Sequence, residues 1–238
     1  MPLLSLPTGA SSSFAISSYE SSSLSSRGLR SDPVETALVF SPLLINSKFG
    51  LMAVKTQHQS SFAMFYCTFT CFKWLNLFEI TQAYYSVYKW FYYLRDKKQI
   101  EVVAYVIMPN HVHFILYFPN EDFNLNMIIG NAKRFLAYEI VKRLKESRSK
   151  LLRTLTLQVT GREAQKGQKH RVFENSFDAK PIFTEKFFHQ KLDYIHANPV
   201  SGKWSLVDDI CSYPHSSASY YLTGKYYLFK PLHFANVF

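Results

Sequence analysis

The ten residues Met108–Tyr117 constrain the fold more than any other stretch of the chain. Pro109 and Asn110 favour a tight turn, and side chains in the strand that follows point alternately to two faces. The opposite faces differ sharply, because one begins with His111 and His113 and the other is uninterruptedly apolar. The apolar face, which must lie against a core, comprises Val112, Phe114, Leu116 and Phe118. Two imidazoles at this spacing can converge on one divalent cation. The alternative is that both histidines simply occupy a half-buried strand.

A second informative stretch is the predicted helix between Thr184 and Pro199. Thr184 is a suitable N-cap, and Pro199 pushes the residue before it out of helical geometry. The core stripe of this helix is Phe188, Leu192 and Ile195. Tyr194 and Asn198 are four residues apart, so the helix presents a phenol and an amide on the same side, next to that stripe. Taken alone, Tyr194 fits a packed aromatic side chain and Asn198 fits an ordinary helix stop.

Taken together, His111-Val112-His113 and Tyr194-x-x-x-Asn198 resemble the HUH single-tyrosine transposases, and specifically the REP-associated tyrosine transposases of bacteria. The resemblance covers about residues 60–225, and its motifs follow the family's order. The matching segments are 105–113, 133–135, 192–200 and 213–218. The resemblance implies an α/β fold of the RRM or ferredoxin-like plait type, with a central antiparallel sheet backed by two helices. It also implies that the sheet face carrying the two histidines is left open to bind single-stranded DNA.

The same resemblance implies a reaction. Tyr194 would attack a DNA phosphate and form a 5′-phosphotyrosine link with a free 3′ hydroxyl, so that the strand can be rejoined. Because a phenol has a pKa of about 10 and is a poor nucleophile near neutral pH, a cation must assist. The family pattern assigns His111, His113 and Asn198 as ligands of that divalent metal, and magnesium or manganese is the expected ion.

Two functions from other classes fit the same residues. A metal-free protein that binds single-stranded nucleic acid on the same fold would use the basic surface and would have no use for Tyr194. A metal-dependent phosphoesterase would activate water at His111 and would not need Tyr194 either. Replacing Tyr194 with Phe therefore separates the transposase mechanism from both alternatives.

The charge of the chain points to a polyanionic partner. A formal net charge of +10 and a pI near 9.4 favour nucleic acid, and the resemblance favours single-stranded or hairpin DNA. No stretch is long and apolar enough to span a bilayer, so no membrane partner is expected. Cys67, Cys71 and Cys211 lack zinc-finger spacing and fit the reducing cytoplasm of a bacterium. The chain is expected to act as a monomer or a homodimer.

A strongly amphipathic helix is predicted at residues 126–146. Its flanks carry the basic side chains Lys133, Arg134, Lys142 and Arg143. Charged helix residues are mostly just solvated, but contact with DNA phosphates is the functional interpretation, and the resemblance favours it for Lys133. Residues 147–171 then predict a mobile basic loop with a short apolar strand at 151–159.

The chain divides into three parts by composition. Residues 1–58 are Ser-rich and predict a disordered extension, within which Met52 is a candidate alternative start. Residues 59–225 carry all the motifs of the transposase-like domain, and residues 226–238 form a tail. Within the domain, the remaining patterns predict strands at 62–73 and 101–108 and a helix at 84–94.

Overall fold

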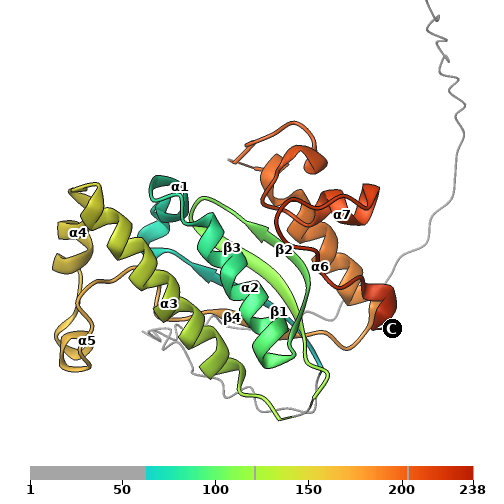
Figure 1. The fold of residues 1–238 in the computed structure, drawn as a ribbon, viewed down its shortest axis with the longest axis horizontal. Coiled ribbons are helices and arrows are strands. Elements are labelled where there is room, and N and C mark those ends of the chain that lie inside the picture. The colour runs from blue at the N-terminus through green and yellow to red at the C-terminus, as the bar shows by residue number, and fades with distance from the viewer. Residues whose placement is uncertain (1–62, 121, 203, 238) are drawn as a thin grey trace, which may run out of the picture. The chain divides into compact units, whose positions relative to one another are not determined.

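The computed structural model describes residues 63–120, 122–202 and 204–237. The predicted Ser-rich extension and Met52 lie outside these residues. Four strands form one antiparallel sheet in the order β2-β3-β1-β4 (Figure 1). They are β1 (Met64–Thr70), β2 (Glu101–Ile107), β3 (His111–Tyr117) and β4 (Asp178–Pro181). The sheet and the helices around it confirm the predicted α/β fold class.

The tight connection between β2 and β3 and the pairing of β1 with β3 define the register of the sheet. Pro109 and Asn110 join β2 and β3 as a hairpin, and β1 lies on the other side of β3, with Thr68 opposite His113. The sequence did not predict β4, a four-residue strand that contains the charged residues Asp178 and Lys180 and ends at Pro181. This composition is tolerated because β4 is an edge strand, where a missing N–H costs nothing in the ladder.

Two long helices cover one face of the sheet. They are α2 (Tyr84–Lys98) and α3 (Leu125–Glu146), at nearly the positions predicted from periodicity. This face holds the larger core, which includes Phe65, Phe69, Phe91 and Phe114, each at most 1% exposed. The alternation predicted for β1 and β3 is therefore correct, because their apolar faces both lie under these helices.

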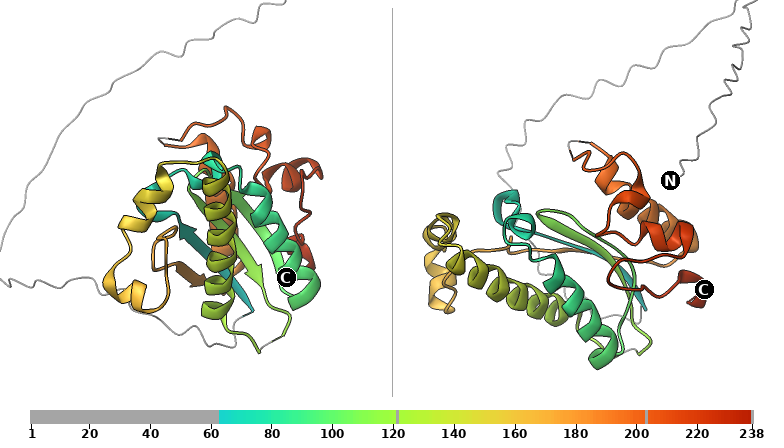
Figure 2. Two further views of the ribbon diagram at one scale, coloured as in Figure 1. Left: turned by 60° about the vertical axis from the view of Figure 1, so that its left-hand side comes forward. Right: turned by 45° about the horizontal axis from the view of Figure 1, so that its top comes forward.

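The histidine face of the sheet is covered as well, which corrects the expectation of an open face. Helix α6 (Glu185–Ala197), joined by the short α7 (Ala218–Thr223), lies on the side opposite α2 and α3 (Figure 2, right). The predicted stripe of Phe188, Leu192 and Ile195 is buried in a second core with Tyr66 and Ile115. The reason is that this face is itself largely apolar beyond the two histidines, so exposing it to water would be costly.

Residues 147–171 also differ from the prediction. Instead of a loop with a short strand, they contain α4 (Leu151–Leu157) and α5 (Gly161–Gln165). Leu151 and Leu155 are four residues apart, which is helical spacing, and Leu155 is fully buried against the α2 and α3 core. A capping box of Thr160 and Glu163 starts α5.

The remaining elements are short. They are α1 (Leu77–Ile80) and the 3-10 helices Phe72–Trp74, Asn198–Val200, Ile210–Ser212 and Phe234–Asn236. The C-terminal segment contributes Phe229 to the main core, and the Leu232 amide donates to the Val102 carbonyl at 3.0 Å. Among the described residues, no helix combines the length and the apolar character needed to cross a membrane.

Candidate active site at the histidine strand and the tyrosine helix

The two histidines form a buried pair at the start of β3. Their ring centroids are 4.6 Å apart and their planes are nearly perpendicular. His111 is 3% exposed and lies beside the rings of Trp74 and Trp204, and His113 is 6% exposed and lies beside the rings of Tyr66 and Tyr194. The alternation of the strand thus places both imidazoles on one face, as predicted from the sequence.

Asn110 sets the orientation of the first imidazole. Its side chain, 1% exposed, donates from Nδ2 to the Trp74 carbonyl at 2.8 Å, so its Oδ1 is the atom 2.7 Å from His111 Nδ1. An amide oxygen only accepts, so Nδ1 of His111 must carry a proton, and in the neutral ring the lone pair then lies on Nε2. That tautomer is the one a metal ligand bonded through Nε2 requires.

The second imidazole is held by hydroxyl groups of β1. Nδ1 of His113 lies 2.8 Å from the Tyr66 hydroxyl and 2.5 Å from the Thr68 hydroxyl. Burial, followed by the nearby charges of His111 and Lys191, lowers the pKa of His113 well below its usual value. His113 is therefore neutral at pH 7, which is the form that binds a metal.

Helix α6 brings Tyr194 to the histidine pair. The Tyr194 ring lies 5.2 Å from the His113 ring and 6.2 Å from the Tyr66 ring, and its side chain is 50% exposed. One turn later, Asn198 Nδ2 donates to the Tyr194 carbonyl at 3.0 Å. This bond uses the amide nitrogen of Asn198. The amide oxygen, which is the atom through which an asparagine binds a metal ion, does not take part in it.

The donor set fits a divalent ion. Two imidazoles with oriented Nδ1 atoms and one amide oxygen suit manganese, zinc or nickel by ligand type, whereas magnesium or manganese is the ion that the family resemblance implies. In the part of the chain that the structure describes, no three His, Cys, Asp or Glu side chains gather at metal-binding spacing.

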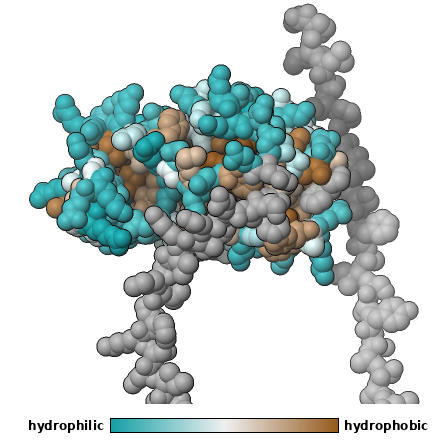
Figure 3. Space-filling view, turned by 90° about the horizontal axis from the view of Figure 1, so that it is seen from below, coloured by the Kyte–Doolittle hydropathy of each residue, from teal (hydrophilic) through white to brown (hydrophobic). Residues whose placement is uncertain are grey.

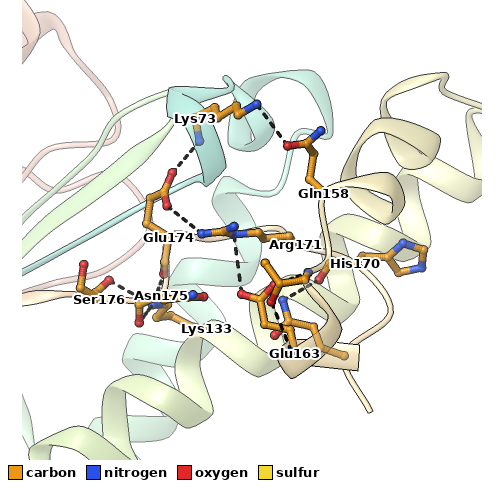
Figure 4. A network of polar contacts seen from close by, with 11 residues as sticks. Lys73, Lys133, Gln158, Glu163, His170, Arg171, Glu174, Asn175 and Ser176 are labelled. Atoms are coloured by element: carbon orange, nitrogen blue, oxygen red, sulfur yellow. Dashed lines mark hydrogen bonds and ion pairs between the residues drawn. The ribbon is translucent and has the colours of Figure 1, made fainter. Parts of the chain in front are cut away.

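The basic residues predicted to contact DNA lie on α3, across the sheet from the histidines. Lys133 Nζ donates to the carbonyls of Glu174, Asn175 and Ser176 at 2.5 to 3.2 Å (Figure 4). Arg143 likewise donates to the carbonyls of residues 81 and 82, at 3.1 and 2.9 Å. Both side chains thus bind protein backbone in this structure, and burial lowers the pKa of Lys133 to about 8.

Arg134 and Lys142, the other two predicted contacts on α3, are exposed. Arg134 belongs to the wall of a groove of about 1530 Å³ between α3, α5 and residues 168–177. Its cationic lining residues are Lys133, Arg134, Lys145, Arg162, Lys166 and Lys169. Figure 3 shows hydrophobic residues between hydrophilic ones at the left, the end of the molecule that carries α4 and α5 in Figure 1.

An ionic network fixes one wall of this groove. Arg171 lies between Glu163, at 3.7 Å, and Glu174, at 3.6 Å, and its guanidinium is 4.5 Å from the Phe72 ring centroid (Figure 4). Glu174 also accepts from the Lys73 amide at 2.8 Å. The two carboxylates in the groove wall share one arginine, and the six cationic lining residues leave the groove with a net positive charge.

Sequence reasoning missed the residues that support the site. Tyr66 and Thr68 alternate with core residues on β1, so their shared face was visible, but their contact with His113 depends on the pairing of β1 with β3. Asn110 lies inside the recognised motif without an assigned role. Trp74 is 54% exposed with its ring 5.4 Å from that of His111, and its left-handed backbone, with φ of 58°, has no sequence signal.

With this geometry established, the chain can be compared with known proteins. Residues 76–159 match the family model described as "Transposase IS200 like". The match covers 84 of the 238 residues, and over this segment the chain is similar to the IS200-like transposases. The match includes His111 and His113 but ends before α6, so Tyr194 and Asn198 lie outside it. The family resemblance inferred from the sequence is confirmed.

Two solved structures of transposases are similar to this chain. One is a REP-associated tyrosine transposase bound to a REP hairpin, 17% identical, covering 74% of this chain and 90% of its own, with a TM-score of 0.50. At that identity the likeness establishes the fold. The other is a putative transposase from Deinococcus radiodurans, 13% identical, covering 59% of this chain and 94% of its own. Its TM-score of 0.31 is too low to support any conclusion. No curated protein sequence matches the chain.

Proposed function

We propose that this protein is an enzyme that cuts and rejoins single-stranded DNA through a phosphotyrosine formed on Tyr194. The observation that carries the proposal is the position of the Tyr194 ring, 5.2 Å from the His113 ring although the two residues come from separate elements. A half-exposed phenol beside two buried imidazoles is an arrangement for nucleophilic attack next to a metal. A protein that only binds nucleic acid has no need of it.

In the proposed step, Tyr194 Oη forms a bond to the scissile phosphorus while the bond from phosphorus to the 3′ oxygen breaks. The phenolic proton passes to water, and the departing 3′ oxygen takes a proton from water. A divalent ion, magnesium or manganese, when bound by His111, His113 and Asn198, supplies polarisation of the phosphate and offsets its developing charge. Asn110 is hydrogen-bonded to His111, and the hydroxyls of Tyr66 and Thr68 are hydrogen-bonded to His113. These bonds fix the orientation of both imidazole rings before a metal ion or DNA binds.

We propose hairpin DNA with an unpaired flank as the substrate. Three observations support this: the structural likeness to a transposase bound to a REP hairpin, the formal net charge of +10, and the cationic groove along α3. Arg134 and Lys142 are the predicted phosphate contacts on α3 that remain exposed to a ligand. Phosphate contacts of this kind position DNA without reading its sequence.

The test is a search for a covalent adduct. The full chain is incubated with end-labelled hairpin oligonucleotides and manganese, and the products are separated under denaturing conditions. We expect a denaturant-resistant protein–DNA adduct from the wild type and none from Tyr194→Phe, with DNA binding nearly unchanged. Tyr85→Phe is the matched control, because Tyr85 is 53% exposed on α2 and lies in the other layer; it should form the adduct normally.

The alternatives give different results. A phosphoesterase would keep cleaving after Tyr194→Phe and stop after His111→Ala. A binding module would bind the hairpin without cleaving it in any variant. Cleavage retained by Tyr194→Phe therefore refutes the proposed mechanism.

A further inference from the structure

Lys191 is placed beside the proposed nucleophile by its own helix. It precedes Tyr194 by three residues on α6, so the two side chains are neighbours on the helix surface. Its ammonium lies 5.0 Å from the Tyr66 ring centroid, 5.2 Å from that of Phe187 and 5.6 Å from that of Tyr194. The charge is thus held over aromatic rings at the edge of the histidine site, and the side chain is only partly exposed.

A second lysine reaches the same sheet face from β4. Lys180 pairs with Tyr66 in the sheet register, so both side chains project toward the α6 side. Burial and the charge of Lys180 lower the pKa of Lys191. Asp178, two residues earlier on β4 and paired with Thr68, is the acid nearest in register. Among the described residues, neither lysine forms an ion pair with a carboxylate, so their positive charge remains available for an anion.

We propose that Lys191, supported by Lys180, is a catalytic residue that binds a non-bridging oxygen of the scissile phosphate during attack by Tyr194. This inference rests on the proposed function and adds a protein cation to it. A phosphodiester carries one negative charge, and a second develops as the phenolic oxygen adds to the phosphorus. A fixed ammonium at that position stabilises the transition state more than the ground state, so it raises the rate more than the affinity.

The competing interpretation is that Lys191 only covers aromatic surface with its methylenes while its charge stays in water. That role needs the stem and not the charge. Lys191→Met keeps an unbranched apolar stem over Tyr66 and Phe187 and removes the charge, so it separates the two interpretations. Lys191→Arg restores a cation of different shape and should recover part of any lost rate.

The first measurement is the single-turnover rate of adduct formation on hairpin DNA with manganese. We expect Lys191→Met to be slower by about 100-fold, with hairpin affinity changed by less than about fivefold, as for loss of one preorganised charge donor. Lys186→Met is the matched control, because Lys186 is exposed in the first turn of the same helix; it should react at the wild-type rate. A wild-type rate for Lys191→Met overturns the inference.

The second measurement needs neither metal nor turnover. In EDTA and in a Tyr194→Phe background, affinity is measured for the hairpin and for the same hairpin with a neutral methylphosphonate at the mapped cleavage site. We expect the neutral group to weaken binding about tenfold when Lys191 is present and less than about twofold in Lys191→Met. Equal weakening in both backgrounds would mean that Lys191 does not touch this phosphate.

The two hypotheses fail in distinguishable ways. If the wild type forms no adduct, the proposed function fails and the role of Lys191 fails with it. If the adduct forms and depends on Tyr194 while the Lys191 tests are negative, the proposed function stands and only the role of Lys191 is refuted.

Discussion

Asn110 is the side chain whose removal should damage the candidate site most specifically. Asn110→Ala deletes two hydrogen bonds, a buried one with His111 Nδ1 and a part-buried one to the Trp74 carbonyl. Each bond contributes about 1 kcal/mol, and leaving its buried partner unsatisfied adds a further cost, so the expected loss is about 2–4 kcal/mol. For a domain of this size, that corresponds to a fall of about 4–16 °C in melting temperature. His111 also loses its fixed tautomer, which should weaken manganese binding by about 10- to 100-fold.

Two assays on the full chain test this: thermal melting, and titration with manganese followed by calorimetry. The matched control is Asn124→Ala, which removes the N-cap bond of α3 to the Met127 amide, at 2.9 Å, in the other layer. That variant should lose about 1 kcal/mol of stability and keep its manganese affinity. The reasoning about Asn110 would be refuted by a variant that binds manganese like the wild type and melts no lower than Asn124→Ala.

Two further predictions concern stability and charge. The His215 ring stacks on the Tyr84 ring, with the centroids 4.0 Å apart, and burial lowers the pKa of His215 to about 4. Between pH 6.5 and pH 4 the unfolded chain therefore binds a proton at His215 that the folded chain does not bind. The free energy of unfolding should fall by about 1–2 kcal/mol as pH drops through this window, after allowing for the partial exposure of His215. Urea denaturation at pH 7 and pH 4.5 should show a smaller fall in His215→Gln than in the wild type. An equal fall in both proteins contradicts this account. Lys133→Met should lower the free energy of unfolding by about 1–3 kcal/mol, because three backbone carbonyls lose a charged donor. Arg134→Met should instead reduce the affinity for the DNA hairpin and the salt dependence of that affinity, without changing stability. A stable Lys133→Met variant with weakened DNA binding would reverse these two assignments.

Local pattern was sufficient for most of the fold. Strict alternation in β3 and helical spacing in α3 each determine which face is buried, and Thr184 caps α6 through its bond to the Phe187 amide as predicted. The covered histidine face was not predictable in the same way. Ile115 follows the histidines on that face, but whether a helix or a ligand covers it depends on where a distant segment packs.

Some features of the candidate site could likewise be predicted from the sequence, and others depended on tertiary packing. The proximity of Tyr194 to His113 was an expectation from the family resemblance, and the structure places the two rings together. The roles of Lys133 and Arg143 were less accessible, because a cation on a helix flank has the same sequence signature whether it binds a phosphate or a loop carbonyl. The support from Tyr66 depended on strand pairing, which sequence alone did not define.

The placement of α6 on the histidine face has a consequence for the choice of nucleic acid. Because both imidazoles are buried and their half-exposed neighbours are Tyr194 and Trp74, a phosphate must approach at the edge of the site where these two rings reach solvent. Single-stranded DNA is flexible enough to bend its backbone into this edge of the site. Double-stranded DNA is stiff and holds its phosphates on the surface of a wide cylinder, which α6 would obstruct. The architecture itself would then discriminate against paired DNA before any base is read.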